Sequence, residues 1–206
     1  MPIIQDLNSF PNTRIIVWEI IETIESLKSG LDLSEISSEK LGKRKSEIHK
    51  KQFLAVRRIF KELLIDDQAV KYDKFGKPQS NSKQNISITH SGNFSAVIIS
   101  DKKVGIDIEI ISDKILKIKD KFLETELNYP IKNSREILLI YWNIKESIFK
   151  SLRTNEIDFR KNILVLPLNC KGNYTKSWYL NKDEIYSYDS YYKIYKNYTL
   201  AYVIQD

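Results

Sequence analysis

Three short strand-like segments follow one another in the middle of the chain with only turns between them. They cover residues 85–89, 94–100 and 104–111. Their connections are four and three residues long, whereas two parallel strands need a crossover of about a dozen residues or more. The sequence therefore predicts an antiparallel meander in this region.

Helical segments surround this meander. Apolar residues at helical spacing predict helices over residues 21–27, 46–64, 115–127 and 135–152. Further strands are expected at residues 13–20, 163–168 and within 177–204. The polar segment 66–83 is expected to be a loop. Because these strands have short connections, the mixture predicts an α+β fold with antiparallel sheets.

Composition excludes several classes of protein. The 206 residues fit one domain or two small halves, and no apolar run is long enough to predict a membrane span. The first ten residues lack the basic and then apolar pattern of a secretion signal, so we expect a cytoplasmic protein. A single cysteine, Cys170, excludes an intrachain disulfide. With two histidines besides it, a structural zinc site has too few ligands.

Positive charge is concentrated in one segment. Residues 40–61 hold nine Lys/Arg against one acid, whereas the whole chain has a net charge of +6. On a helix, two series at seven-residue spacing would share one side: Lys43, Lys50 and Arg57, and Arg44, Lys51 and Arg58. This side is either the solvated face of an amphipathic helix or a cationic wall for phosphates or an acidic partner.

Two carboxylates stand close together on the third strand of the meander. Because alternate residues of a strand face opposite sides, Asp107 and Glu109 should project together, with Ile106 and Ile108 turned to a core. Two neighbouring carboxylates repel unless a cation or a proton lies between them. Mg²⁺ is a suitable cation, since it binds one or two carboxylates together with phosphate and water. The alternative is a solvent-facing acidic pair.

A second group of polar residues lies in the expected helix 135–152. Trp142, Glu146 and Lys150 share one helix face, at spacings of four residues. They are either a surface ion pair beside a packed tryptophan, or a third carboxylate with a nearby cation. The chain contains no nucleophile elbow, Walker loop or dinucleotide fingerprint.

Five motifs, weak singly, together resemble those of a known family. In chain order they are Gly76-Lys77-Pro78, Asn85-Ile86-Ser87-Ile88-Thr89-His90-Ser91, Gly105-Ile106-Asp107-Ile108-Glu109, Phe122 through Glu126, and Trp142-x-x-Lys145-Glu146-Ser147-x-x-Lys150. In order and separation this set resembles the 4′-phosphopantetheinyl transferases of the surfactin-synthetase-activating type. The resemblance covers residues 76–150 and is loose in the N-terminal third.

The resemblance implies a fold and an activity. The fold is a pseudo-twofold pair of similar α+β lobes, here residues 1–103 and 104–206, with the active site between them. The activity is transfer of the phosphopantetheine arm of coenzyme A to a serine of an apo carrier protein, with release of 3′,5′-ADP. The implied partners are coenzyme A and an acidic acyl or peptidyl carrier protein, without a membrane or a nucleic acid, and we expect a monomer.

The resemblance also assigns roles to individual residues. The expected Mg²⁺ ligands are Asp107, Glu109 and Glu146. The expected catalytic residues are Glu109, Glu146 and Lys150. The expected coenzyme A contacts are Lys77, Pro78, Thr89, His90, Lys145 and Lys150. Arg44 and Arg57 are added from the basic segment as candidates for the 3′-phosphate, because no position there matches the family pattern.

Two alternative functions remain open. One is a protein that binds coenzyme A or a carrier without activity, although the presence of all three carboxylates and Lys150 speaks against it. The other is a basic nucleic-acid-binding protein, favoured by the basic segment. That alternative leaves the carboxylates unexplained, because without a metal they would repel phosphate.

Overall fold

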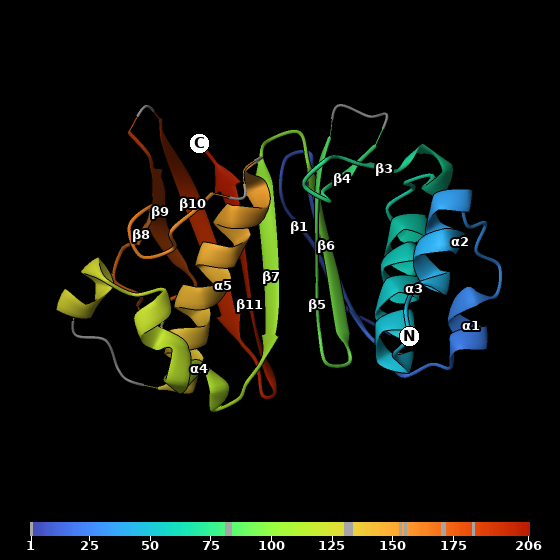
Figure 1. The fold of residues 1–206 in the computed structure, drawn as a ribbon, viewed down its shortest axis with the longest axis horizontal. Coiled ribbons are helices and arrows are strands. Elements are labelled where there is room, and N and C mark those ends of the chain that lie inside the picture. Colours follow the sequence, from blue (N-terminus) through green and yellow to red (C-terminus); the bar gives the residue numbers. More distant parts are fainter. Residues whose placement is uncertain are drawn as a thin grey trace. The chain divides into compact units, whose positions relative to one another are not determined.

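The chain forms two compact units, Met1–Asp101 and Lys102–Asp206, each with its own antiparallel sheet (Figure 1). The computed structural model describes residues 2–80, 84–129, 134–152, 154, 156–169, 172–182 and 184–206. Cys170 lies outside these described residues. The boundary between the units falls two residues before the expected one.

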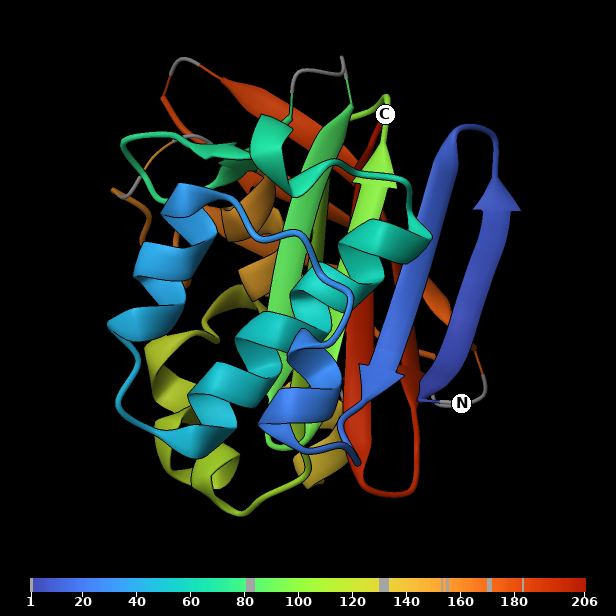
Figure 2. The same ribbon diagram turned by 90° about the vertical axis from the view of Figure 1, so that its right-hand side faces the viewer.

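The first unit contains a six-stranded sheet with strand order β1-β2-β6-β5-β4-β3. Its strands are β1 (Ile3–Phe10), β2 (Thr13–Glu19), β3 (Lys71–Tyr72), β4 (Pro78–Gln79), β5 (Asn85–Ser91) and β6 (Phe94–Ser100). Its helices are α1 (Ile24–Lys28), α2 (Glu35–Gly42), α3 (Glu47–Glu62) and the 3₁₀ turn η1 (Asp67–Ala69). Helices α1, α2 and α3 lie together on one face of the sheet (Figure 2).

Helix α3 is amphipathic and forms the core of the first unit. Leu54, Ile59 and Phe60 are buried and pack against the even-numbered residues of β2, such as Ile16. Burying such a side chain stabilises the fold by roughly 1.5–3 kcal/mol. The apolar half of the predicted helix is therefore present in the structure.

The predicted basic side of this helix is wrong in part. Because α3 begins at Glu47, Lys43 caps the end of α2 and Arg44 lies in the connection before α3. Arg57 is 3% exposed and so does not belong to a solvated face. Arg58 donates hydrogen bonds to the main-chain carbonyls of residues 26, 27 and 29 at the end of α1. Four of the six cations of the expected wall are thus used within the unit or lie off the helix.

The second unit contains a five-stranded sheet with strand order β7-β11-β10-β9-β8. Its strands are β7 (Val104–Ile110), β8 (Ile163–Val165), β9 (Tyr174–Leu180), β10 (Ile185–Ile194) and β11 (Tyr198–Gln205). Its helices are α4 (Lys114–Ile118) and α5 (Arg135–Ser151), with 3₁₀ turns η2 (Lys119–Lys121) and η3 (Thr125–Asn128). The long helix α5 packs on the sheet through Ile140, Ile144 and Ile148.

Three expectations about the elements are corrected. The segment 66–83, expected to be a loop, contains η1, β3 and β4. Strands β5 and β6 form the expected hairpin, but β7 pairs with β11 in the other sheet and so does not continue the meander. The helix expected over 115–127 ends at Ile118 and is followed by the two 3₁₀ turns. The turn η3 carries Glu126 into the interior of the unit, a long-range contact that helical periodicity does not encode.

Helix α5 approaches β7 closely at a glycine. A Cβ atom on Gly105 would lie 1.8 Å from the main-chain oxygen of Ser147, so no larger residue fits here without a shift of the backbone. Alternate residues share a face, so α5 covers the face of β7 that carries Asp107. The expected alternation is present, but the carboxylates lie on the helix side, and Ile106 and Ile108 are buried on the other face.

The two units share one feature of their topology. In each unit, the strand that directly precedes the helices pairs with the last strand of that unit. In the first unit β2 precedes the helices and pairs antiparallel with β6. In the second unit β7 precedes the helices and pairs antiparallel with β11. In each unit the long helix then packs on the sheet that these two strands help to form.

Candidate functional site

The last turns of α5 and the middle of β7 bring opposite charges together. Asp107 is 3% exposed, and the Lys150 ammonium lies 2.6 Å from its Oδ1 atom. The same ammonium donates a second hydrogen bond, of 3.2 Å, to the main-chain oxygen of Ile106. Asp107 is therefore not a solvent-facing acid, because it is buried beneath α5 and paired, whereas Glu109 is half-buried.

Glu146 lies one helical turn before Lys150 and is half-buried. Burial, and then the negative charge of Asp107, raise the pKa of Glu146 to about 7. The Lys150 ammonium acts in the opposite direction, and the charge of Glu109 adds a further increase. Since charges perturb a pKa only over short distances, the structure brings Asp107, Glu109, Glu146 and Lys150 into one electrostatic cluster.

The donor set suits a hard divalent cation, although no ready-made metal cage is present. Within the described residues, no three His, Cys, Asp or Glu side chains are gathered closely enough to hold an ion. The Lys150 ammonium forms an ion pair with the Asp107 carboxylate oxygen that a metal ion would need. Carboxylates are oxygen ligands of the kind that Mg²⁺ prefers, so Asp107, Glu109 and Glu146 could hold the ion only if their side chains rearranged.

Trp142 shares a helix face with Glu146 but lies among aromatic rings. Its ring centroid is 5.3 Å from that of Phe122 and 5.6 Å from that of Phe159. Edge-on and tilted pairs of this kind are favourable beyond their buried area. Trp142 therefore anchors α5 to the neighbouring turns, and the charged cluster begins one turn further along.

Lys145, expected to contact coenzyme A, is fully buried. Its side chain is 0% exposed, and its ammonium lies 2.7 Å from a carboxylate oxygen of Glu126. It also donates hydrogen bonds to the main-chain oxygens of Phe159 and Ile163. Burial lowers the pKa of Lys145, and Glu126 opposes that effect. We correct the expectation, because an ammonium with three internal partners is a structural group.

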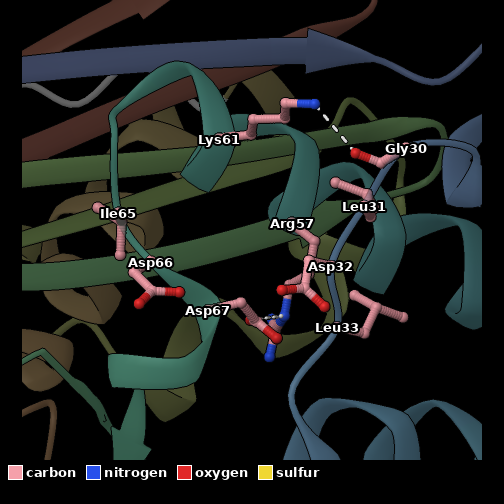
Figure 3. Close-up of a pocket in the computed structure, with 9 residues that line it drawn as sticks. All are labelled: Gly30, Leu31, Asp32, Leu33, Arg57, Lys61, Ile65, Asp66 and Asp67. Carbon is pink, nitrogen blue, oxygen red and sulfur yellow. Dashed lines mark hydrogen bonds and ion pairs between the residues drawn. The ribbon is translucent and has the colours of Figure 1, made fainter.

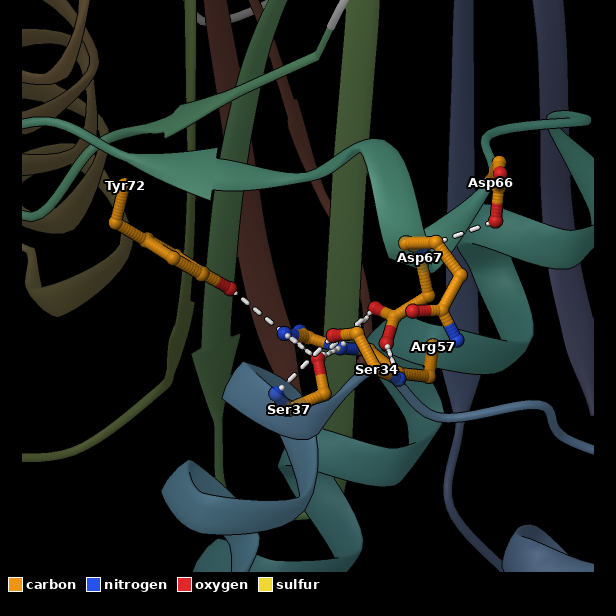
Figure 4. A network of polar contacts seen from close by, with 7 residues as sticks. Ser34, Ser37, Arg57, Asp66, Asp67 and Tyr72 are labelled. Carbon is orange, nitrogen blue, oxygen red and sulfur yellow. Dashed lines mark hydrogen bonds and ion pairs between the residues drawn. The ribbon is translucent and has the colours of Figure 1, made fainter.

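Arg57, the other candidate from the basic segment, is also paired internally. Figure 4 shows its guanidinium among Ser37, Asp67 and Tyr72. Its Nε atom is 2.9 Å from Asp67, and its Nη2 donates a 2.7 Å hydrogen bond to the Tyr72 hydroxyl. Asp67 also accepts hydrogen bonds from the Ser34 N–H and the Ser37 hydroxyl. The positive charge of Arg57 is therefore largely neutralised within the first unit.

Arg44 differs from Arg57 because it has no acidic partner among the described residues. Its guanidinium lies 4.1 Å from the centre of the Phe53 ring, and that of Arg57 lies 3.8 Å from the same centre. Burial lowers the pKa of Arg44, and the positive charge of Arg57 lowers it further. The guanidinium of Arg44, which has no acidic partner in the described parts of the chain, is therefore a candidate group for binding an anion in the first unit.

The remaining expected contacts lie in β4, β5 and the turn before them. The Lys77 N–H donates a 3.0 Å hydrogen bond to Asp73, in a turn where Gly76 has a φ of +79°. Pro78 is paired in register with Tyr72, the residue that contacts Arg57. His90 is exposed near the end of β5, whereas Thr89 is 4% exposed and points to the other face.

A separate pocket of about 220 Å³ opens behind Arg57 (Figure 3). It is lined by Gly30, Leu31, Asp32, Leu33, Arg57, Lys61, Ile65, Asp66 and Asp67. Lys61 donates a 3.0 Å hydrogen bond to the Gly30 carbonyl at its rim, and Arg57 is paired with Asp67 at its wall. Apart from Arg57, none of the expected site residues lines it.

Sequence reasoning missed the internal partners of the buried cations. Asp67 and Tyr72 fall in the segment expected to be a loop, and they pair with Arg57. Glu126 belongs to the motif Phe122 through Glu126, but the sequence predicted no role for it. In the structure it pairs with Lys145. The adjacent acids Asp66 and Asp67 follow the basic helix in the sequence. They were the feature from which an ion pair with that helix could have been predicted.

No protein-family model matches the chain, and no curated protein matches its sequence. Within the described parts of the chain, none of the helices combines the length and the apolar character needed to cross a bilayer. A proposal about function therefore depends on the motifs and on the geometry of the charged residues.

The pKa of Glu146 gives a testable dependence of stability on pH. Between about pH 4.5 and pH 7 the folded protein holds a proton on Glu146 that the unfolded chain has released. The free energy of unfolding should therefore fall as pH rises through this range. Glu146→Gln removes this contribution, so the variant should gain up to about 3 kcal/mol relative to wild type by pH 8.

Chemical denaturation at pH 5, 6, 7 and 8, in metal-free buffer with a chelator, measures this difference. The matched control is Glu156→Gln, because Glu156 is exposed and should give a curve parallel to wild type. Parallel curves for wild type and Glu146→Gln would show that Glu146 is ionised like an ordinary surface acid.

Proposed function

We propose that this protein is a Mg²⁺-dependent 4′-phosphopantetheinyl transferase. The observation that carries the proposal is the single electrostatic cluster of Asp107, Glu109, Glu146 and Lys150. These residues come from two separate motifs of the family resemblance, and β7 and α5 bring them together. Neither a structural role nor nucleic-acid binding explains three carboxylates whose charges act on one another around one lysine.

In the proposed reaction the serine oxygen of the carrier attacks the β-phosphorus of coenzyme A. The bond between that phosphorus and the oxygen bridging to the α-phosphate breaks, so the arm is transferred and 3′,5′-ADP leaves. Mg²⁺ held by Asp107, Glu109 and Glu146 would supply neutralisation of pyrophosphate charge. The serine proton goes to a carboxylate of the cluster or, through it, to water.

The residues of the cluster have distinct tasks in this scheme. Without a metal ion the pKa of Glu146 is raised to about 7, so binding of Mg²⁺ would release its proton and leave it ionised as a ligand. Glu109 is then the second carboxylate available as a base. Lys150 carries an ammonium at the end of a flexible side chain and donates hydrogen bonds to the phosphate oxygens.

We assign the nucleotide end of coenzyme A to the first unit. The motif positions of the family resemblance assign contacts with this nucleotide to Lys77, Pro78, Thr89 and His90. Arg44 enters because of its unneutralised guanidinium. Arg57 contacts the same Phe53 ring as Arg44 but is paired with Asp67, so we assign it no direct contact with the phosphate. An exposed His90 can reach a ligand directly, whereas the buried Thr89 can take part only through its backbone or through a change in the strand.

The internal similarity of the two units supports the finer fold assignment. Each unit has a strand that precedes the helices and pairs with the last strand of the same unit. We therefore propose that the units are the two lobes of a pseudo-twofold phosphopantetheinyl transferase fold. We also propose that the protein is a cytoplasmic monomer and that its carrier partner is acidic.

The nucleic-acid alternative loses support. Arg57 pairs with Asp67, Arg58 binds three main-chain carbonyls, and Lys61 binds the Gly30 carbonyl. Phosphate backbones are bound by lysine and arginine groups that can reach them. Three of the cations that favoured nucleic acid are thus committed to holding the first unit together.

Mass spectrometry of apo carrier proteins tests the proposal. Incubation with coenzyme A, Mg²⁺ and the protein should add the mass of one phosphopantetheine arm to an acidic carrier. Asp107→Asn should lower the rate about 100-fold or more, because it removes a ligand of the charge-neutralising ion. Asp32→Asn, at an exposed acid of the first unit, is the matched control and should be fully active.

Two results would contradict the proposal. One is the absence of arm transfer to acyl and peptidyl carriers alike, with coenzyme A bound. That outcome would favour a binding protein without activity. The other is full transfer by Asp107→Asn, which would remove the carboxylate cluster from the chemistry.

A further inference from the structure

Lys150 is held inside the carboxylate cluster rather than extended from it. Its side chain is 26% exposed, and that of Asp107 is 5% exposed. The ammonium donates hydrogen bonds to the Asp107 carboxylate at 2.6 Å and to the Ile106 carbonyl at 3.2 Å, both in β7. A charge-assisted hydrogen bond of this length to a buried carboxylate is among the stronger polar contacts in proteins.

This position conflicts with the two roles that the proposed function gives these residues. Asp107 cannot give its Oδ1 fully to a metal ion while an ammonium is bound to it, because both are cations at one oxygen. Lys150 cannot contact a phosphate of coenzyme A while its ammonium is directed into β7. One movement, rotation of the Lys150 side chain away from Asp107, removes both conflicts.

The charges of the cluster favour such an exchange. Asp107, Glu109 and Glu146 can carry three negative charges against the one positive charge of Lys150. A divalent ion therefore compensates the cluster better than the ammonium does. Lys150 is half-buried and sits at the end of α5, in its last turn, so its side chain has solvent-facing conformers available once it leaves Asp107.

We propose that Lys150 is an exchangeable counter-cation, which occupies Asp107 in the metal-free protein and leaves it when a divalent metal ion binds. The freed ammonium is then available to the phosphates of coenzyme A. This inference rests on the proposed function. Its consequence is that Lys150 weakens metal binding, so its removal tightens the metal site even though it impairs transfer.

Resonances of labelled lysine side chains report this exchange directly. In protein with ¹³C- and ¹⁵N-labelled lysine, the Lys150 signal is assigned by its loss in Lys150→Arg. Addition of Mg²⁺ should shift this signal towards that of an exposed lysine. Lys176 is the matched control, because it is paired with Asp189 at 2.9 Å in the same unit and should not shift.

Metal affinity gives the second readout. Calorimetric titration with Mg²⁺, with and without coenzyme A, should give a dissociation constant about tenfold lower for Lys150→Met than for wild type. Lys176→Met should bind Mg²⁺ like wild type. If Lys150→Met does not fold, the resonance experiment on the wild-type protein decides the question alone.

The possible failures are distinguishable. If Mg²⁺ binds while the Lys150 signal and the affinity of Lys150→Met stay unchanged, the exchange is wrong and the proposed function stands. If coenzyme A alone shifts the Lys150 signal and Mg²⁺ does not, the ligand releases the lysine and the exchange is likewise overturned. If no divalent ion binds with or without coenzyme A, both the exchange and the metal-dependent function fail.

Discussion

Replacing Gly105 with alanine should strongly destabilise the second unit. The new Cβ atom would lie 1.8 Å from the oxygen and 2.6 Å from the carbon of the Ser147 carbonyl. This neighbour is helix backbone, which cannot rotate away as a side chain can. Helix α5 would have to move off β7, and overpacking of this kind costs at least about 1–3 kcal/mol. Because α5 carries Lys150, the shift should also separate Lys150 from Asp107.

Chemical denaturation measures this loss, and Gly42→Ala is the matched control. Gly42 is the last residue of α2, and a Cβ there would have no heavy atom within 4 Å. Alanine is the better helix former, so Gly42→Ala should be neutral or stabilise by about 0.5–1 kcal/mol. A Gly105→Ala protein as stable as wild type would show that β7 and α5 are not in close contact.

Breaking the ion pair of Lys145 and Glu126 should also strongly destabilise the second unit. Both side chains are 0% exposed, so a single replacement leaves a buried charge without its partner. Lys145→Met or Glu126→Gln alone should each cost about 3–5 kcal/mol. The double variant should recover part of this loss, because it leaves no charge behind. Glutamine at position 126 keeps an oxygen for the Val165 N–H, which now donates to Glu126.

A double-mutant cycle measured by denaturation gives the coupling between the two residues. The control pair is Glu39 and Lys43, which are 62% and 73% exposed on α2 and its cap. Glu39→Gln and Lys43→Met should couple by no more than about 0.5 kcal/mol. Additive effects of the buried pair would place Lys145 in solvent and restore it as a candidate contact of coenzyme A.

Local patterns predicted most of the regular elements because their periodicity is local. The helix expected over 135–152 is Arg135–Ser151 in the structure, and the strand expected over 94–100 is β6 with the same bounds. The eight-residue elements β1 and α2 were missed. For α2 a signal was present, since Ser34 is a typical capping residue and accepts a hydrogen bond from the Ser37 N–H.

Residue spacing predicted which site residues share a face of a strand or a helix. It did not predict which residues are brought together by contacts between distant parts of the sequence. Alternation on β7 placed Asp107 and Glu109 on one face, and helical spacing put Glu146 beside Lys150. Helical spacing puts Lys150 on the face of Glu146 and Lys145 on another face, but it does not show that Lys145 is buried in the core beside an acid. This position of Lys145 depends on Glu126, which is remote in the sequence and enters the core through a 3₁₀ turn.

The pairing of β7 with β11 determines when this site can form during synthesis. Val104 is paired in register with Ile204, so the second sheet joins segments that lie almost a whole unit apart in the chain. The first unit has the same property, since Thr13 is paired with Ser100. Contacts this distant in sequence form late, because closing a long loop precedes any gain from the pairing. On the ribosome, we expect the first unit to fold once β6 has emerged. The strand that carries Asp107 can pair only after β11 has been synthesised.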